Sequence, residues 1–395
     1  MKIAVLTSGT NNTPPMYEPL RDLGHDLMVV TYDAMTLHEH NDLPAIIDAF
    51  APGWVLYIGA IVGHHGKPVP DVGVLAQIGA AHLLVHFCCD GAEPYWWRQL
   101  DQYYDAGRFA LQVNVDGVKI GPIGDRGLTL LCPVDVTKFD DRPWNKRRHA
   151  CGFAGGLHGG RAEIFRMLVS EGSVTLRDRD ADPGQEGYRS FLEDCRVGIN
   201  AAYTGGNTGQ MHVKFRAAGE LPAAGCLVLE TEGSPLGDWF DAGSDFLQYT
   251  DANTARNAIA WSTSHADEAR AIAQRLRAKV AERHSPAVFW SQVMERIGIG
   301  RALLPAREVP NRHWFHFPLP NHGAAPERLQ PPQRDEPVLV GSLNAVNMVC
   351  YEQQIYAVPQ RLGPIDLTCN RHHAAVRKFS DMDSIRAAII AGAIQ

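Results

Sequence analysis

The sequence lacks the patterns that mark most membrane, zinc and disulfide-bonded proteins. None of its apolar runs reaches about 18 residues, so no transmembrane helix is expected. The eight cysteines are scattered, with no CxxC pair and no metal-ligand spacing, and no HExxH pattern occurs. Several cysteines lie in apolar runs, which favours reduced core thiols in a cytoplasmic protein.

Two further absences reduce the number of possible functions. The glycine fingerprint of dinucleotide-binding domains is missing after the first apolar run, where the residues are TSGTNN, so a nicotinamide-dependent enzyme is disfavoured. The net charge of -7 gives no overall attraction to nucleic acid. The opening MKIAVLTSG has too short an apolar run for a secretory signal and instead predicts a first buried strand.

What the chain does contain is two rounds of strand–helix alternation. A chain of 395 residues is longer than a single hydrophobic core usually accommodates, which predicts two domains. Apolar runs typical of buried parallel strands alternate with helical spacing in the first round, which predicts a Rossmann-like, doubly wound domain over residues 1–145. Its expected strands are 2–6, 27–32, 54–59, 82–88, 109–117 and 128–135. Ligands are expected at the loops that follow the first four: 7–12, 32–33, 59–67 and 89–93.

The second round predicts a similar domain over residues 146–300, after a polar segment at 140–148 that we interpret as a linker. Residues 301–337, rich in proline, arginine and histidine, predict an extended linker. Residues 338–395 predict a small extension with a β-hairpin, formed by VNMVCY and IYAV, and a closing helix at 382–394. The expected fold class is therefore α/β, with two Rossmann-like doubly wound domains facing a cleft and a small hairpin-containing extension.

The second domain carries three features that suit a phosphate group. In FAGGLHGGR, a strand is followed by a glycine-rich turn and then by a helix. Gly156, His158 and Arg161 lie in this turn and at the start of the helix. Glycines alone are a weak signal, because any strand-to-helix turn uses them. Lys214 and Arg216 are two cations that could neutralise a diphosphate leaving group. The alternative for this pair is a solvated helix end matched with neighbouring acids.

The third feature is Glu220, whose carboxylate could accept hydrogen bonds from the hydroxyls of a sugar or ribose. The alternative is simple charge matching at a helix start. An acidic turn containing Gly233 and Ser234 follows the next apolar run.

These segments resemble a known family. LHGGRAEIFRML, INAAY and KFRAAGELPAAGCLVLETEGSPLGDWFDAGSDFLQY resemble the carboxy-terminal domain of GT-B glycosyltransferases of group 1, and most of all the CgeB-like, spore-maturation-protein type. The family pattern has a basic pair, Phe-Glu, a small-residue helix, an apolar strand, a glycine-rich turn and a W-F-x-x-G-x-D segment. This chain departs at one place: Gly219, not phenylalanine, precedes Glu220, and the segment after Arg216 is about one residue longer.

The resemblance implies a hexosyl- or related transferase that takes a nucleotide-diphosphate sugar as donor, with no bound catalytic metal and no cofactor. It implies that the donor is bound by residues in the glycine turn, the basic pair, the carboxylate and the acidic turn: Gly156, His158, Arg161, Lys214, Arg216, Glu220, Gly233 and Ser234. An Asp-Arg-Asp triplet at 178–180 matches the metal-binding pattern of other transferases, and we interpret it as a chance match. The donor nucleotide, the acceptor (a glycan, lipid, protein or small molecule) and the oligomeric state stay open.

If the enzyme inverts the sugar configuration, a general base must remove the acceptor proton. The candidates are Asp90, at the end of the fourth expected strand, and His64 and His65, in the loop after the third. The alternatives are a helix cap for Asp90 and an exposed loop for the histidines, and a retaining enzyme would need no such base. Two other functions stay open: a sugar-nucleotide epimerase on the same fold, and a non-catalytic carbohydrate-binding member.

Overall fold

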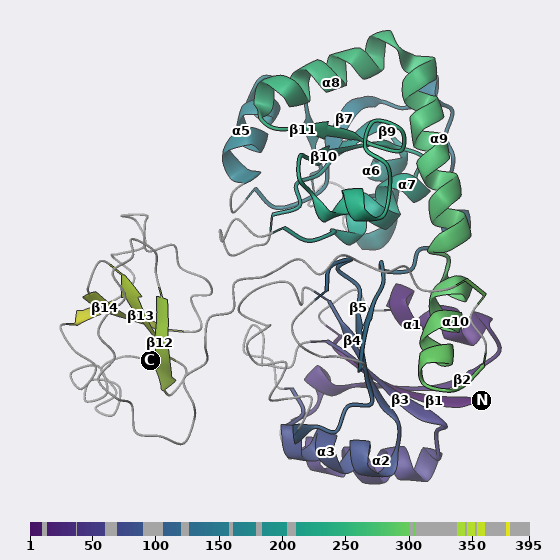
Figure 1. The fold of residues 1–395 in the computed structure, drawn as a ribbon, viewed down its shortest axis with the longest axis vertical. Helices are drawn as coiled ribbons and strands as arrows, with labels where there is room; N and C mark the ends of the chain where they lie inside the picture. Colours follow the sequence, from purple (N-terminus) through teal and green to yellow (C-terminus); the bar gives the residue numbers. More distant parts are fainter. Residues whose placement is uncertain are drawn as a thin grey trace. The chain divides into compact units, whose positions relative to one another are not determined.

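The chain divides into two compact units, Met1–Trp314 and Phe315–Gln395 (Figure 1). The computed structural model describes residues 1–9, 14–36, 38–59, 69–89, 106–119, 126–157, 161–178, 184–203, 211–300 and 303–304, together with four strands of the second unit. Within these residues no helix is long and apolar enough to cross a membrane.

The first sheet has six parallel strands in the order β2-β1-β3-β4-β5-β6. Its central strands are buried along nearly their whole length, which is why they read as continuous apolar runs. The reversal of strand order at β1 is the doubly wound topology expected from the sequence. The strands are β1 (Lys2–Thr7), β2 (Asp26–Thr31), β3 (Trp54–Ile58), β4 (Leu84–Cys88), β5 (Leu111–Asn114) and β6 (Gly127–Thr129).

Helices cover both faces of this sheet (Figure 1). On one face lie α2 (Leu43–Phe50) and α3 (Val72–Ala81), whose apolar residues share a core with alternate residues of β1 and β3. On the other face lie α1 (Pro14–Asp22) and α10 (Pro286–Arg296). The chain therefore returns from the second sheet to the first, where Trp290 of α10 packs on Trp54 with ring centroids 6.1 Å apart.

The second sheet has five parallel strands in the order β11-β10-β9-β7-β8. The strands are β7 (His149–Phe153), β8 (Thr175–Leu176), β9 (Cys195–Ile199), β10 (Leu227–Thr231) and β11 (Leu247–Tyr249). Two apolar cores enclose the sheet. They are built with α5 (Ala162–Ser170), α6 (Gly184–Glu193), α8 (Ala252–Ser264) and α9 (Ala266–Arg283). The first unit, Met1–Trp314, also contains short 3₁₀ turns. They are η1 (Tyr32–Ala34), η2 (Glu39–Asp42), η4 (Val136–Lys138), η5 (Trp144–Lys146) and η8 (Pro235–Asp238).

Hydrogen bonds join the segments that follow the two sheets. The amide of Val213 donates to the carbonyl of Asp116 at 2.8 Å. The buried indole N–H of Trp239 donates to the carbonyl of Gly117, also at 2.8 Å. Gly117 has a φ of 67°, and a Cβ there would lie 2.9 Å from the Trp239 indole nitrogen, so glycine is required on both counts. This contact ties the turn after β5 to the segment after η8.

The described part of the second unit is an antiparallel sheet in the order β12-β13-β14-β15. Its strands are β12 (Val338–Leu343), β13 (Val346–Tyr351), β14 (Gln354–Pro359) and β15 (Arg377–Phe379). The pairing of β13 with β14 confirms the hairpin predicted from VNMVCY and IYAV. The predicted linker at 301–337, apart from residues 303 and 304, and the predicted helix at 382–394 lie outside the described residues.

Candidate functional site

The glycine turn after β7 is shaped around an arginine. A Cβ atom at Gly155 would lie 2.9 Å from Nη1 of Arg216 and 2.6 Å from the ring of Phe153, closer than real Cβ contacts. The Nε of Arg161 donates to the carbonyl of Gly156 at 3.1 Å. The glycine turn is therefore close to Arg216, which the sequence analysis assigned to the same phosphate site. His158 lies outside the described residues.

Two guanidinium groups share the ring of Phe153, the last residue of β7. Arg216 lies 5.6 Å and Arg161 5.8 Å from its centroid. A cation near an aromatic ring is attracted by the ring's negative faces, which offsets part of the repulsion between two like charges. Both arginines are only partly buried, so their charges can reach a ligand at the carboxyl edge of the sheet.

A second aromatic residue, Tyr188 of α6, extends this array. The guanidinium of Arg177, just after β8, lies 5.4 Å from the Tyr188 ring. The Tyr188 hydroxyl accepts a hydrogen bond from Nε of Arg216 at 3.1 Å. We call Arg161, Arg177, Arg216, Phe153 and Tyr188 the arginine–aromatic array. Sequence reasoning missed Arg177 and Tyr188, because nothing local distinguishes them from ordinary residues of a strand end and a helix.

The turn that carries Arg216 and Glu220 is a π-helix. Residues Arg216–Glu220 form η7, which continues into α7 (Leu221–Ala223) with a proline in its first turn. A π-turn holds about one residue more than an α-turn, which is compatible with the longer segment that the resemblance predicts here. Glu220 lies close to the arginine–aromatic array.

Glu220 is tied to that array through Tyr188. The Tyr188 hydroxyl donates to Oε2 of Glu220 at 2.5 Å. Burial raises the pKa of Glu220, and the hydrogen bond from Tyr188 and the charge of Arg216 act in the opposite direction without cancelling the rise. Burial also raises the pKa of Tyr188, and the Glu220 charge adds to that rise, so the phenol keeps its proton.

Lys214 acts on a different carboxylate, Glu230, which is fully buried in β10. Oε2 of Glu230 accepts from Nδ2 of Asn200 at 2.7 Å, and Oε1 accepts from the amide of Thr231 at 2.7 Å. Burial raises the pKa of Glu230, while these hydrogen bonds and the positive charge of Lys214 lower it. The charges of Lys214 and Arg216 both act on Glu230, and Arg216 also belongs to the array; binding of a diphosphate by this pair stays a prediction.

The acidic turn has a visible local role. Ser234 is 3% exposed, and its hydroxyl accepts from the amide of Leu236 at 3.2 Å as the cap of η8. Gly233 has a φ of 72°, a left-handed conformation that favours glycine. These geometries account for both residues within the fold, and a contact of either with a donor stays a prediction.

The carboxyl edge of the first sheet has a different character. Asp33 accepts from the Ser8 hydroxyl and from the Gly9 amide, both at 2.7 Å. His86 in β4 lies 2.9 Å from the carbonyl of Gly59, and burial lowers the pKa of its imidazole to about 4. The candidate bases Asp90, His64 and His65 lie outside the described residues and stay predictions.

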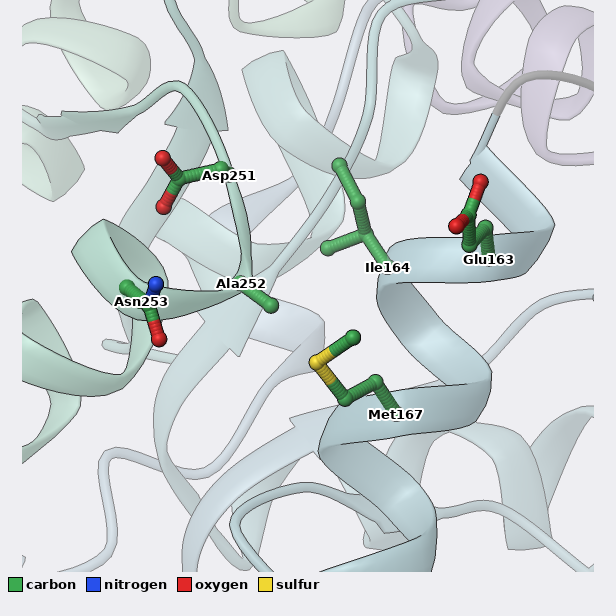
Figure 2. Close-up of a pocket in the computed structure, with 6 residues that line it drawn as sticks. All are labelled: Glu163, Ile164, Met167, Asp251, Ala252 and Asn253. Carbon is green, nitrogen blue, oxygen red and sulfur yellow. The ribbon is translucent and has the colours of Figure 1, made fainter.

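A separate shallow pocket of about 250 Å³ lies between α5 and α8 (Figure 2). Ile164 and Met167 of α5 face Ala252 of α8 across it. Glu163, Asp251 and Asn253 complete its lining, and the Asp251 carboxylate is already used to cap α8. None of the predicted donor-binding residues lines this pocket.

One comparison with known proteins matches part of the chain to a family. Residues 172–295, which include Tyr188, Arg216 and Glu220, match a family model described as "Glycosyl transferase-like". The comparison with curated proteins gives no match.

Solved structures resemble the chain in fold. An Anabaena HepE structure with UDP-glucose has a TM-score of 0.53 at 12% identity, over 75% of this chain and 99% of that one. An alpha-glucosyltransferase bound to UDP and a 13-mer DNA has a TM-score of 0.53 at 11% identity, over 75% and 100%. A glycosyltransferase from Rickettsia africae has a TM-score of 0.50 at 11% identity, over 75% and 98%.

Two parallel sheets, each doubly wound, and the helix α10, which returns to the first sheet, make up a GT-B fold. The family match lies on the half of that fold that carries the arginine–aromatic array. The chain is an enzyme of the glycosyltransferase class, as its resemblance to group 1 transferases predicted.

Proposed function

We propose that this enzyme transfers a sugar from a nucleotide-diphosphate sugar, with a UDP-sugar as the first donor to test, and that it does so without a bound metal. The observation that carries the proposal is the arginine–aromatic array at the carboxyl edge of the second sheet. Three guanidinium groups, those of Arg161, Arg177 and Arg216, gather there around two rings beside a glycine turn. We also propose that the chain is of the CgeB-like type, on the sequence pattern around 214–245.

The array suits the chemistry of the leaving group. When the sugar–phosphate bond breaks, negative charge grows on the diphosphate, and fixed cations at that point lower the barrier. Arg216 and Arg161 lie close to the glycine turn, where a diphosphate can also meet backbone N–H groups and the start of α5. This supplies the charge compensation that a metal ion provides in other transferases.

Glu220 suits the hydroxyl-bearing part of the donor. Its Oε2 is held by Tyr188, and its Oε1 has no hydrogen-bond partner among the described residues. An ionised carboxylate only accepts hydrogen bonds, so the second oxygen can bind ribose or sugar hydroxyls. Arg216 and Glu220 then hold the two chemically distinct ends of one ligand.

The test is a panel of nucleotide diphosphates and their sugars, examined first by thermal shift and then by release of the free nucleotide. We expect at least one diphosphate to raise the melting temperature, and the matching donor to be consumed equally well in EDTA. The Lys214→Ala/Arg216→Ala protein is the control and is expected to lose both effects. A folded native protein that none of the panel stabilises would contradict the proposal. Isomerised donor without transfer would support the epimerase alternative instead.

A further inference from the structure

Arg216 and Glu220 carry opposite charges at the two ends of the same π-helical turn, yet they do not pair. Within the described residues, Arg216 makes one hydrogen bond, from Nε to the Tyr188 hydroxyl. Glu220 makes one hydrogen bond, also with that hydroxyl. Among the described groups, the Tyr188 oxygen is thus the one that is hydrogen-bonded to both charged side chains.

A tyrosine hydroxyl has one proton, so the direction of both hydrogen bonds is fixed. The guanidinium can only donate, so the hydroxyl accepts from Arg216 and gives its own proton to Oε2 of Glu220. This leaves the two terminal nitrogens of Arg216 without an acceptor among the described residues. One of them, Nη1, lies near Gly155 in the glycine turn. It also leaves Oε1 of Glu220 without a donor.

A direct contact would change this. Arginine and carboxylate groups favour a two-point contact in which both oxygens meet two N–H groups. That contact would use the nitrogens and the oxygen that are available to a ligand, and would quench both charges inside a partly buried site. In place of that contact, the Tyr188 hydroxyl is hydrogen-bonded to both groups.

We propose that Tyr188 is a positioning residue that holds Arg216 and Glu220 apart, so that the guanidinium stays available for a diphosphate and the carboxylate for hydroxyl groups. The inference rests on the proposed function of this site. Tyr188 also packs on Arg177 through its ring. The proposed role belongs to the hydroxyl alone, and a Tyr188→Phe variant therefore separates it from packing.

The experiment is a double-mutant cycle with UDP binding measured by calorimetry. Without its hydroxyl, residue 188 allows Arg216 and Glu220 to pair, and we expect Tyr188→Phe to weaken UDP binding about tenfold, the scale of one charge-assisted hydrogen bond. A neutral amide cannot form an ion pair, so the same substitution in a Glu220→Gln background is expected to cost less than about twofold. An equal loss in both backgrounds would mean that Tyr188 acts through packing or direct contact, and would overturn the inference.

Two further variants serve as controls for this interpretation. Tyr188→His retains one ring nitrogen to accept from Arg216 and one N–H to donate to Glu220, and is expected to lose less affinity than Tyr188→Phe. Tyr17→Phe removes the hydroxyl of a buried tyrosine residue in α1, which packs on the other sheet, and is expected to leave UDP binding unchanged.

A crystal structure of the ligand-free Tyr188→Phe protein tests the inference without any donor. We expect a direct ion pair between Arg216 and Glu220 there. Side chains that stay apart would overturn the inference even if the native protein binds UDP. Conversely, a native protein that binds no nucleotide diphosphate would defeat the proposed function, while this structure would still decide whether Tyr188 separates the pair.

Discussion

The two sheets of this enzyme share a parallel topology, but the carboxyl edges of their strands have opposite character. At the second sheet, Arg161, Arg177 and Arg216 are held against aromatic rings, and the terminal nitrogens of Arg216 have no acceptor in the described part of the chain. In the described part of the first sheet's edge, Asp33 accepts two hydrogen bonds, and burial lowers the pKa of the His86 imidazole to about 4.

The same parallel topology therefore gives two kinds of carboxyl edge. Parallel strands deliver loops to the same edge in both sheets, but the residues just beyond each strand decide the chemistry. In the second sheet, Phe153 lies in one apolar core and Tyr188 packs against the other, and both rings also provide surfaces on which cations lie. In the first sheet, internal hydrogen bonds use the polar groups to fix the turns themselves. This contrast supports the proposal that the charged donor binds at the second sheet.

The largest expected effect comes from removing the guanidinium that faces the glycine turn. Arg216→Ala deletes a cation positioned for the leaving diphosphate, and should lower kcat/KM for a UDP-sugar about 10²–10³-fold, as removal of one preorganised electrostatic group does elsewhere. Arg256→Ala is the matched control, because the Arg256 side chain on α8 is 39% exposed and pairs with Glu171. Steady-state kinetics of both variants measures the difference. Native-like turnover by Arg216→Ala would remove the basis for assigning the donor to this sheet.

A smaller effect is expected when Arg216 is displaced but kept. In Gly155→Ala the new Cβ would meet Nη1 of Arg216 at 2.9 Å and the Phe153 ring at 2.6 Å. The flexible guanidinium must move, so UDP-sugar turnover should fall about tenfold while the fold is retained. Gly237→Ala is the control, because nothing lies within 4 Å of a Cβ there. If both variants turn over donor equally well, the close approach of Arg216 to the turn has no functional meaning.

Part of the fold and part of the candidate site could be predicted from the sequence. Buried parallel strands such as WVLYI are apolar throughout, so the strand order along the chain and the doubly wound class were predictable. Arg216 and Glu220 were predicted from their charges beside a helix start and from the family resemblance. Tyr188 was not, because its partners lie 28 and 32 residues away and only the fold brings them together. The return of α10 to the first sheet was missed for the same reason: its amphipathic pattern shows an apolar face but not which sheet covers it.

At the first sheet the expected effect is on stability rather than turnover. Because burial lowers the pKa of His86 from 6.5 to about 4, the unfolded chain binds a proton between these values that the folded chain does not. The contribution is complete above about pH 6.5 and is lost progressively as the pH falls to 4, by about 3 kcal/mol over the window. His86→Phe keeps an aromatic ring between Tyr57 and Phe109 and should abolish this component.

Urea unfolding of the two proteins between pH 4 and 7 measures that difference. Groups with raised pKa, such as Glu220 and Glu230, oppose the trend but are present in both proteins and cancel in the comparison. His265→Gln, at an exposed position between α8 and α9, is expected to keep the native pH dependence. Equal slopes for native and His86→Phe proteins would show that the buried imidazole does not resist protonation.

The smallest effect is expected within the second sheet's own domain, at the pocket between α5 and α8. Met167 is 46% exposed there, and its neighbours offer two carboxylates but no cation. A nucleotide diphosphate would meet repulsion from Glu163 and Asp251 in this pocket, whereas the arginine–aromatic array attracts it. Met167→Ser should therefore leave UDP binding and donor turnover within about twofold of the native protein, since exposed substitutions away from a site change little. A large loss in this variant, measured beside Arg216→Ala, would move the donor from the array to the pocket.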